Sequence, residues 1–279
     1  MYFRLLALDL DDTLLDDTYR ISEQNYQAIR RAAAAGVLVT LATGRMFRSA
    51  RRYARKLKID LPLITYHGAL VRTADSKATL LHRPVPLEPA REVVEKALAS
   101  GLHVNVYLND ELYVSGENEF SRYYHTLSGV AYRVVPDLPA FLAAEPTKIT
   151  IISNDKGSLQ QLQAQILKKY SGRLTAVFSK PNFLEITDIR ATKGQALAYL
   201  AKLHGIPREQ VAAIGDSYND LDMLRYAGVS VAVANARSEV KAVAKIITKS
   251  NIEHGVAAFI DTYLLNGEEE YADDVKRNA

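Results

Sequence analysis

The chain has 279 residues, with 35 Lys and Arg against 32 Asp and Glu, a formal net charge of +3, and no cysteine. A composition of 48% apolar and 24% charged residues excludes a mostly disordered chain, and the length allows one or two domains. Without cysteine there are no disulfides, thiolate zinc sites or thiol nucleophiles, and so small a net charge does not indicate nucleic-acid binding.

The N-terminal apolar run is interrupted by Arg4 and ends at Asp9, which is too short for a signal peptide. No stretch approaches the ~20 apolar residues that span a bilayer. We therefore expect a cytoplasmic protein with neither a membrane nor a nucleic-acid partner, acting as a monomer or homodimer.

The first third alternates buried strands with helices, a rhythm that favours a parallel sheet covered by helices on both faces. The predicted elements are a strand at 3–10, a helix capped by Ser22 and ending at Gly36, a strand at 37–42, a helix at 46–58 and a strand at 61–66. The predicted helix at 46–58 has one basic face opposite an apolar one. The basic face carries Arg48, Arg51, Arg52 and Arg55.

The last third resumes this rhythm. Its predicted elements are a helix at 194–204, a strand at 211–214, a helix at 221–228, a strand at 229–234 and a helix at 237–245. The tail from Gly267 is polar and lacks periodicity, so we expect it to be frayed.

The middle of the chain has a different pattern, with antiparallel hairpins and helices. It comprises predicted strands at 103–108, 111–115, 148–153, 174–179 and 183–187, and helices at 88–100, 118–127 and 157–170. Asn109-Asp110 is typical of a hairpin turn. The fold class is therefore α/β, with a parallel-sheet core at 1–83 and 189–279 and an inserted α+β domain at 84–188.

The first candidate site follows the first strand. Asp9 and Asp11 lie two residues apart, so on an extended chain their carboxylates face the same crevice. Such a pair repels and favours a nearby cation. Taken alone, the pair is more typical of a solvated turn with Asp12 as a helix or turn cap.

Two further signals lie at a strand end and at a helix start. Thr43, Gly44 and Arg45 follow the second strand, where a hydroxyl and free backbone N–H groups suit phosphoryl oxygens. Lys193 begins a helix, where a cation opposes the helix dipole and a buried anion would explain it. Each signal alone is also compatible with a helix cap or a surface lysine.

The last cluster follows the strand at 211–214. Asp216, Asn219 and Asp220 concentrate oxygen ligands, a set that suits Mg²⁺ in the absence of His or Cys. Asp222 fits the exposed face of the following helix, and we expect it to be solvated.

Together these clusters resemble the haloacid dehalogenase (HAD) superfamily, in its Cof-like subclass (IIB) with a large cap domain. The resemblance rests on DLDDT at 9–13, Thr43 in LATGR, Lys193 in TKG and GDSYND at 215–220, with supporting matches at HGAL (67–70), LEIT (184–187) and SNIEHGV (250–256). His67 departs from the pattern, because the subclass usually has Asn there. The implied fold is a Rossmann-like HAD core with the domain at 84–188 as a cap that selects the substrate.

The resemblance implies a Mg²⁺-dependent phosphatase that hydrolyses small phosphomonoesters, such as sugar phosphates or phosphorylated cofactors, through an aspartyl-phosphate on Asp9. Asp11 would act as general acid and base, Thr43 would hold a phosphoryl oxygen, and Lys193 would neutralise charge. The implied metal ligands are Asp9, Asp11, Asp216, Asn219 and Asp220. Arg45 and His67 are candidate substrate contacts.

Two other functions are compatible with the same residues. A phosphotransferase or phosphohexomutase would pass the phosphoryl group from the same Asp9 to a second hydroxyl. A non-catalytic phosphate-sensing protein would bind a ligand without turnover. In each case, the expected partner is a small phosphorylated metabolite.

Overall fold

The computed structural model describes residues 3–265, so the tail predicted to be frayed from Gly267 lies outside the described residues. The described chain folds into two compact units. The first contains residues 3–44, 50–80 and 192–265, and the second contains residues 45–49 and 81–191. Within residues 3–265, no helix is both long and apolar enough to cross a membrane.

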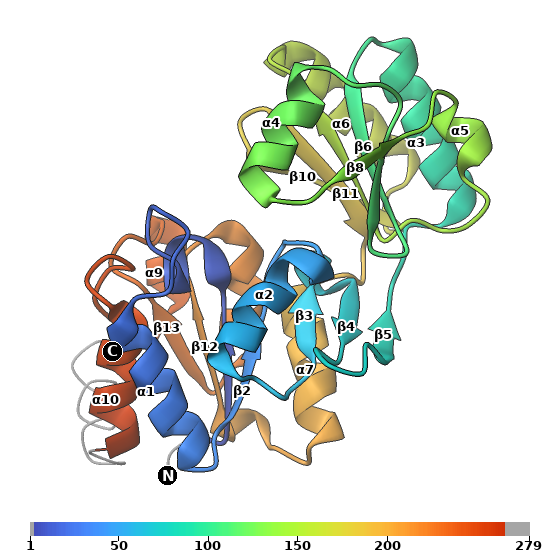
Figure 1. Cartoon of the computed structure of the whole chain (residues 1–279). Coiled ribbons are helices and arrows are strands. Elements are labelled where there is room, and N and C mark those ends of the chain that lie inside the picture. Colours follow the sequence, from blue (N-terminus) through green and yellow to red (C-terminus); the bar gives the residue numbers. More distant parts are fainter. Residues whose placement is uncertain (1–2, 266–279) are drawn as a thin grey trace. The chain divides into compact units, whose positions relative to one another are not determined.

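The first unit is built on a five-stranded parallel sheet in the order β14-β13-β12-β1-β2 (Figure 1). The strands are β1 (Leu5–Leu8), β2 (Leu38–Leu41), β12 (Val211–Gly215), β13 (Val229–Ala232) and β14 (Ile246–Ile247). Every residue of β1 and β12 is buried, because both strands lie inside the sheet and are covered on both faces. The predicted α/β class is thereby confirmed.

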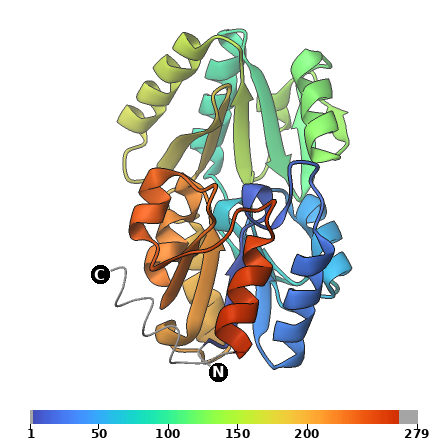
Figure 2. The same ribbon diagram turned by 90° about the vertical axis from the view of Figure 1, so that its left-hand side faces the viewer.

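Helices cover both faces of this sheet. They are α1 (Glu23–Ala34), α7 (Lys193–Leu203), α8 (Leu221–Tyr226), α9 (Ser238–Val243) and α10 (Gly255–Leu265). α1 and α10 pack side by side although they lie at opposite ends of the chain, whereas α8 packs against α7 and α9 (Figure 2). These helices form two groups, one on each face of the sheet. Right-handed crossovers explain this division, because the chain moves from β1 to β2 in one direction along the sheet and from β12 to β13 in the opposite direction.

One predicted strand of the first third belongs to a different sheet. The sequence predicts that the segment 61–66 extends the parallel sheet, but β3 (Leu63–Thr65) forms a separate antiparallel sheet with β4 (Leu70–Arg72) and β5 (Thr79–His82). A single parallel bridge, between Ala42 and Ile64, joins β3 to the end of β2. The reason is a sharp reversal at Tyr66, His67 and Gly68, which all have positive φ and turn the chain back on itself.

The helix α2 (Phe47–Leu57) has the two faces that the sequence predicts. The apolar side chains Met46, Ala50, Tyr53, Ala54 and Leu57 are buried. Arg48, Arg52 and Arg55 are exposed, and Arg51 is half-buried and donates to the carbonyl of Ala74.

The second unit is built on a six-stranded mixed sheet in the order β10-β11-β9-β6-β7-β8. Its strands are β6 (His103–Leu108), β7 (Glu111–Val114), β8 (Tyr132–Val134), β9 (Lys148–Ile152), β10 (Leu174–Lys180) and β11 (Phe183–Asp188), and its helices are α3 (Leu87–Ala99), α4 (Glu119–Ser128), α5 (Leu138–Phe141) and α6 (Lys156–Lys169). The predicted β6–β7 hairpin is confirmed: its two turn residues, Asn109 and Asp110, have φ of 55° and 61°. Positive φ at both positions matches the twist of the strands.

The buried imidazole of His103 in β6 has two side-chain partners. Its Nε2 lies 2.9 Å from Asn105 Oδ1, and its Nδ1 lies 3.0 Å from Asn118 Nδ2. An imidazole that donates through Nε2–H and accepts through Nδ1 satisfies both contacts only when it is neutral. Burial lowers the pKa of His103 in agreement with this arrangement, although the bond to Asn105 acts in the opposite direction.

This lowered pKa predicts acid sensitivity. Because the unfolded chain binds the proton more readily than the folded one, His103 costs stability as pH falls below about 6.5, its ordinary pKa. We expect His103→Leu to lose less stability than the wild type between pH 7.5 and 5.5, measured by urea unfolding followed by circular dichroism. Equal losses in the two proteins would contradict a neutral buried imidazole.

Candidate active site

The site lies where two neighbouring strands of the parallel sheet end. Asp9 directly follows β1, and Asp216 directly follows β12. The chain leaves these two strands in opposite directions, which makes the gap beyond their carboxyl ends the expected ligand crevice of an open α/β sheet. The backbone N–H of Asp9 donates to the carbonyl of Ile214 at 3.1 Å, so the parallel pairing continues up to the site.

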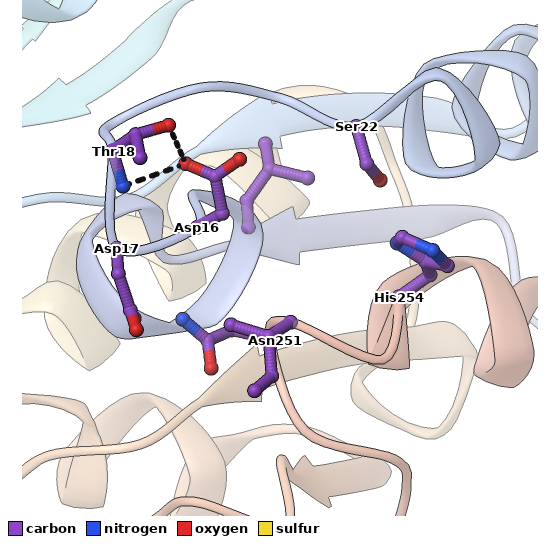
Figure 3. A pocket seen from close by; sticks show the side chains of 8 residues that line it. Asp16, Asp17, Thr18, Ser22, Asn251 and His254 are labelled. Atoms are coloured by element: carbon purple, nitrogen blue, oxygen red, sulfur yellow. Dashed lines mark hydrogen bonds between the residues drawn. The ribbon is translucent and has the colours of Figure 1, made fainter.

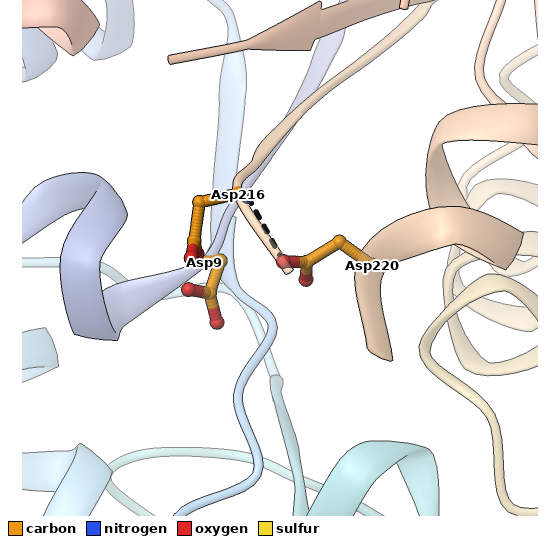
Figure 4. Close-up of side chains that lie close together, drawn as sticks. All are labelled: Asp9, Asp216 and Asp220. Atoms are coloured by element: carbon orange, nitrogen blue, oxygen red, sulfur yellow. Dashed lines mark hydrogen bonds between the residues drawn. The ribbon is translucent and has the colours of Figure 1, made fainter. Parts of the chain in front are cut away.

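Three carboxylates converge at this point (Figure 4). One oxygen from each of Asp9, Asp216 and Asp220 lies within 4.8 Å of the others. The ammonium of Lys193 lies between two of them, with Nζ 2.6 Å from Asp9 Oδ1 and 2.6 Å from Asp220 Oδ1. Lys193 is 0% exposed, and this pair of partners explains why a cation begins a helix.

Asp220 is held by the backbone as well as by Lys193. Its Oδ2 accepts from the N–H groups of Asp216 at 3.1 Å and Ser217 at 3.0 Å, while its Oδ1 accepts from Lys193. A Cβ on Gly215 would overlap this carboxylate, so the glycine permits the close approach. Both oxygens of Asp220 therefore serve internal contacts, which favour a positioning role.

The electrostatics of the cluster favour an additional cation. Burial raises the pKa of Asp9 well above its ordinary value; Lys193 opposes the rise, and Asp220 and Asp216 add to it. Burial and then Asp220 raise the pKa of Asp216 to about 7, although its Oδ1 accepts from Thr13 Oγ1 at 2.9 Å. Burial acts to lower the pKa of Lys193, but Asp220 and Asp9 raise it above its ordinary value.

The donor set fits a hard divalent cation. Three carboxylates face one ammonium, so the cluster keeps an excess of negative charge when ionised. Asn219, in the turn that joins Asp216 to Asp220, adds an amide whose buried Oδ1 has no hydrogen-bond partner within the described part of the chain. Oxygen donors without His or Cys in the cluster are the ligands that Mg²⁺ prefers.

The start of α7 is fixed from two sides. The Thr192 side chain accepts from the N–H of Gln195, and Asp222 Oδ2 accepts from the N–H of Gly194 at 2.8 Å. The expectation that Asp222 is solvated is therefore wrong, because its carboxylate satisfies a backbone donor in the first turn of α7. The sequence indicates that the first N–H groups of this helix need acceptors. It does not show which carboxylate accepts from them.

Gly68 allows the chain to approach this helix start closely. It has φ of +96°, and a Cβ there would overlap the carbonyl of Thr192, the residue before Lys193. A side chain at position 68 would therefore push on the backbone that carries the buried ammonium.

Two of the remaining predicted residues, Thr43 and His67, are hydrogen-bonded to each other through the backbone. Thr43 is buried; its N–H donates to Ile64 and its carbonyl accepts from the N–H of His67. The ring of His67 packs against Gly44, and its Nδ1 lies 3.2 Å from Asn219 Nδ2, so it contacts a predicted metal ligand.

Asp11 lies in the wide helical turn η1 (Leu10–Leu14), and it is half-buried. Arg45 groups with the second unit, where its guanidinium lies 3.5 Å from Ser49 Oγ. The chemical roles of both residues stay predictions.

A separate cavity of about 280 Å³ lies in the first unit behind the loop that follows η1 (Figure 3). Its polar lining includes Asp16, Ser22, Asn251 and His254. One carboxylate oxygen of Asp16 accepts from Thr18 and Arg20, which folds the loop on itself. This cavity is lined by none of the predicted site residues.

Comparisons with known proteins agree with this geometry. A family model described as haloacid dehalogenase-like hydrolase matches residues 6–260. The chain is 32% identical over 270 residues to YxeH of Bacillus subtilis, covering 94% of this chain and 99% of that protein. It is 30% identical to the 5-amino-6-(5-phospho-D-ribitylamino)uracil phosphatase YwtE of the same organism, covering 95% and 99%.

Solved structures give the same result. A haloacid dehalogenase-like hydrolase from Bacteroides thetaiotaomicron superposes with a TM-score of 0.87 at 29% identity, covering 93% of this chain and 98% of that one. The chain belongs to the haloacid dehalogenase-like hydrolase family. The family and the enzyme class that the motifs indicate are confirmed.

The close approach at Gly68 predicts a large effect of one methyl group. We expect Gly68→Ala to destabilise the protein by about 2–5 kcal/mol, which sums the cost of positive φ and of overpacking. Gly36→Ala is the matched control, because Gly36 has φ of +88° with no atom near its would-be Cβ. It isolates the cost of φ, and equal losses in thermal unfolding would contradict the contact with Thr192.

Proposed function

We propose that this hydrolase is a Mg²⁺-dependent phosphatase that acts on small phosphomonoesters through an aspartyl-phosphate on Asp9. The observation that supports this proposal is the buried Lys193 between Asp9 and Asp220, beside Asp216. A nucleophilic carboxylate attacks a phosphate dianion only if cations offset their repulsion. Lys193 supplies one such cation in a fixed position.

Asp9 is the proposed nucleophile. Its carboxylate oxygen bonds to phosphorus as the bond from phosphorus to the leaving oxygen breaks, and Asp11 gives that oxygen a proton. Asp11 then takes a proton from water, whose oxygen attacks phosphorus and releases inorganic phosphate from Asp9. Thr43 would hold a non-bridging oxygen, and Lys193 would keep Asp9 oriented and balance the phosphoryl charge.

Asp9, Asp216 and the carbonyl of Asp11 are the residues that we propose to hold Mg²⁺. When bound, this ion would keep Asp9 ionised and offset the charge of the substrate. Asn219 and Asp220 would act directly or through water, and the contacts of Asp220 favour the indirect role.

The proposed substrates are sugar phosphates or phosphorylated cofactors. The relative YwtE is named as a 5-amino-6-(5-phospho-D-ribitylamino)uracil phosphatase, which makes this compound a natural first candidate. We further propose that the unit inserted in the chain acts as a cap that selects the organic part of the substrate, with Arg45 and His67 as additional contacts.

Asp9→Asn is expected to lower phosphate release from p-nitrophenyl phosphate by at least about 10³-fold, because the amide is not a nucleophile. Asp60→Asn, an exposed substitution, should leave turnover unchanged. The measurement is inorganic phosphate released with Mg²⁺ present. Transfer of the phosphoryl group to an added sugar without release of phosphate would instead support a phosphotransferase, and ligand binding without either reaction would support a sensor.

A second expectation concerns the metal. EDTA should abolish turnover, and Asp216→Asn should raise the Mg²⁺ concentration needed for half-maximal activity by at least about 10-fold, since it removes a charged oxygen donor. Activity titrated against Mg²⁺ measures this change. Metal-independent turnover by the wild type would refute the proposed cofactor while leaving the role of Asp9 to the preceding experiment.

A further inference from the structure

The turn η1 carries Asp11, the proposed proton donor, and its backbone is irregular at two consecutive residues. Asp11 has an extended backbone, with φ of −72° and ψ of 131°, whereas Asp12 is left-handed, with φ of 59°. A residue with a Cβ resists the left-handed region, and it stays there only where the surrounding structure holds it. The contacts that hold η1 therefore also determine where the chain places the carboxyl group of Asp11.

Two asparagines from late in the chain donate to the backbone of this turn. Asn235 Nδ2 lies 2.7 Å from the carbonyl oxygen of Asp12. Asn251 Nδ2 lies 3.0 Å from the carbonyl oxygen of Leu15, the residue that ends the turn. Figure 3 shows the Asn251 amide directed toward the segment that begins at Asp16. The two asparagines are also bonded to each other, since Asn235 Oδ1 accepts from the backbone N–H of Asn251 at 3.0 Å.

A third asparagine contacts the turn from α1. Asn25 is 0% exposed, and its Nδ2 lies 3.4 Å from the carbonyl oxygen of Leu14. Its Oδ1 accepts from the N–H of Ala257 in α10 at 2.9 Å. The contact with Leu14 is longer than an ordinary N–H···O bond, so it is the weakest of the three. We call Asn25, Asn235 and Asn251 the asparagine clamp.

The helices α1 and α10 have apolar contacts of their own, so the clamp is not what joins them. Their buried apolar side chains include Ala28, Ile29, Phe259 and Ile260. Thr13, inside η1, adds a further restraint on the turn, because its Oγ1 donates to Asp216 Oδ1 at 2.9 Å. The polar contacts of this region therefore converge on η1.

We propose that the asparagine clamp fixes η1 so that the Asp11 carboxyl meets the leaving oxygen, an inference that rests on the phosphatase function proposed above. Asn25, Asn235 and Asn251 are therefore positioning residues, which act through backbone carbonyls and not on the substrate. Because a catalytic group misplaced by about 1 Å costs as much as about 10²-fold in rate, a small shift of η1 is enough to matter. Asp9 precedes the turn and is held by β12, so its attack on phosphorus depends less on the clamp.

The test compares two phosphomonoesters whose leaving groups differ in their need for a proton. p-Nitrophenyl phosphate releases a stabilised phenolate, whereas benzyl phosphate releases an alkoxide that must be protonated as it leaves. Both compounds carry one aromatic ring and no hydroxyl in the organic part. Because the leaving group departs when the aspartyl-phosphate forms, kcat/KM for each compound reports that step. Loss of proton transfer therefore lowers the value for benzyl phosphate selectively.

We expect Asn235→Ala to lower kcat/KM for benzyl phosphate by about 10-fold and the value for p-nitrophenyl phosphate by less than about twofold. The measurement uses the full-length enzyme at saturating Mg²⁺. Asn235 is exposed, so water replaces its bonds in the variant, which should fold. Asp11→Asn gives the upper limit of the same selective loss, about 10²- to 10⁴-fold.

Ser22→Ala is the matched control. Ser22 Oγ accepts from the N–H of Asn25 at 3.2 Å at the start of α1, so its loss costs stability beside the clamp without removing a bond to η1. This control should keep the wild-type ratio of the two kcat/KM values. If Asn235→Ala does not fold, Asn251→Ala carries the same test, because it removes the bond to Leu15 and keeps the backbone N–H that Asn235 accepts.

A readout that does not depend on activity tests the clamp itself. Hydrogen–deuterium exchange of the peptide covering residues 10–16 should be about 3- to 10-fold faster in Asn235→Ala than in Ser22→Ala, the effect of losing one hydrogen bond. Equal exchange overturns the clamp, and equal losses of kcat/KM for the two compounds overturn its role in proton transfer. If the wild type hydrolyses neither compound, the phosphatase function fails, and the exchange alone then decides whether the clamp holds η1.

Discussion

The buried ammonium of Lys193 is the interaction on which the first unit depends. Three carboxylates lie within 4.8 Å of one another at the ends of β1 and β12, and two of them contact this single cation. Without it, Asp9 and Asp220 would be carboxylates only 5% and 0% exposed with no cation of the chain to balance them, which is a severe cost. The start of α7, the cap by Asp222 and the close turn at Gly68 all serve to hold that ammonium in place.

The position of these charged residues at the ends of buried strands also explains why the site can be predicted from the sequence. Buried parallel strands leave continuous apolar runs, and polar residues at their carboxyl ends stand out against them. Asp9 and Asp216 are identifiable in this way, and the sheet order brings their strands together. Lys193 is detectable for a different reason, because a cation at a helix start opposes the dipole unless an anion faces it.

What the sequence does not show depends on contacts between distant segments. The reversal at residues 66–68 moves β3 into its own sheet, and an apolar run alone does not specify which strand it will pair with. The sequence suggests a solvated Asp222 because its acceptor role requires Gly194, 28 positions away. The sequence also does not predict the helix α10. Its residues are apolar nearly all round, so they lack the periodic apolar stripe by which a surface helix is identified.

The two units differ in how they satisfy their buried polar groups. In the first, opposite charges meet at 2.6 Å, and this arrangement suits a step in which charge on phosphorus must be balanced whatever the rest of the substrate is. In the second, the charges of Lys148 and Glu185 cancel, and the buried Nδ2 of Asn105 has no hydrogen-bond partner within the described residues. The described part of the chain therefore accommodates its buried charges in two ways: an excess of carboxylates around one ammonium in the first unit, and a one-to-one ion pair in the second.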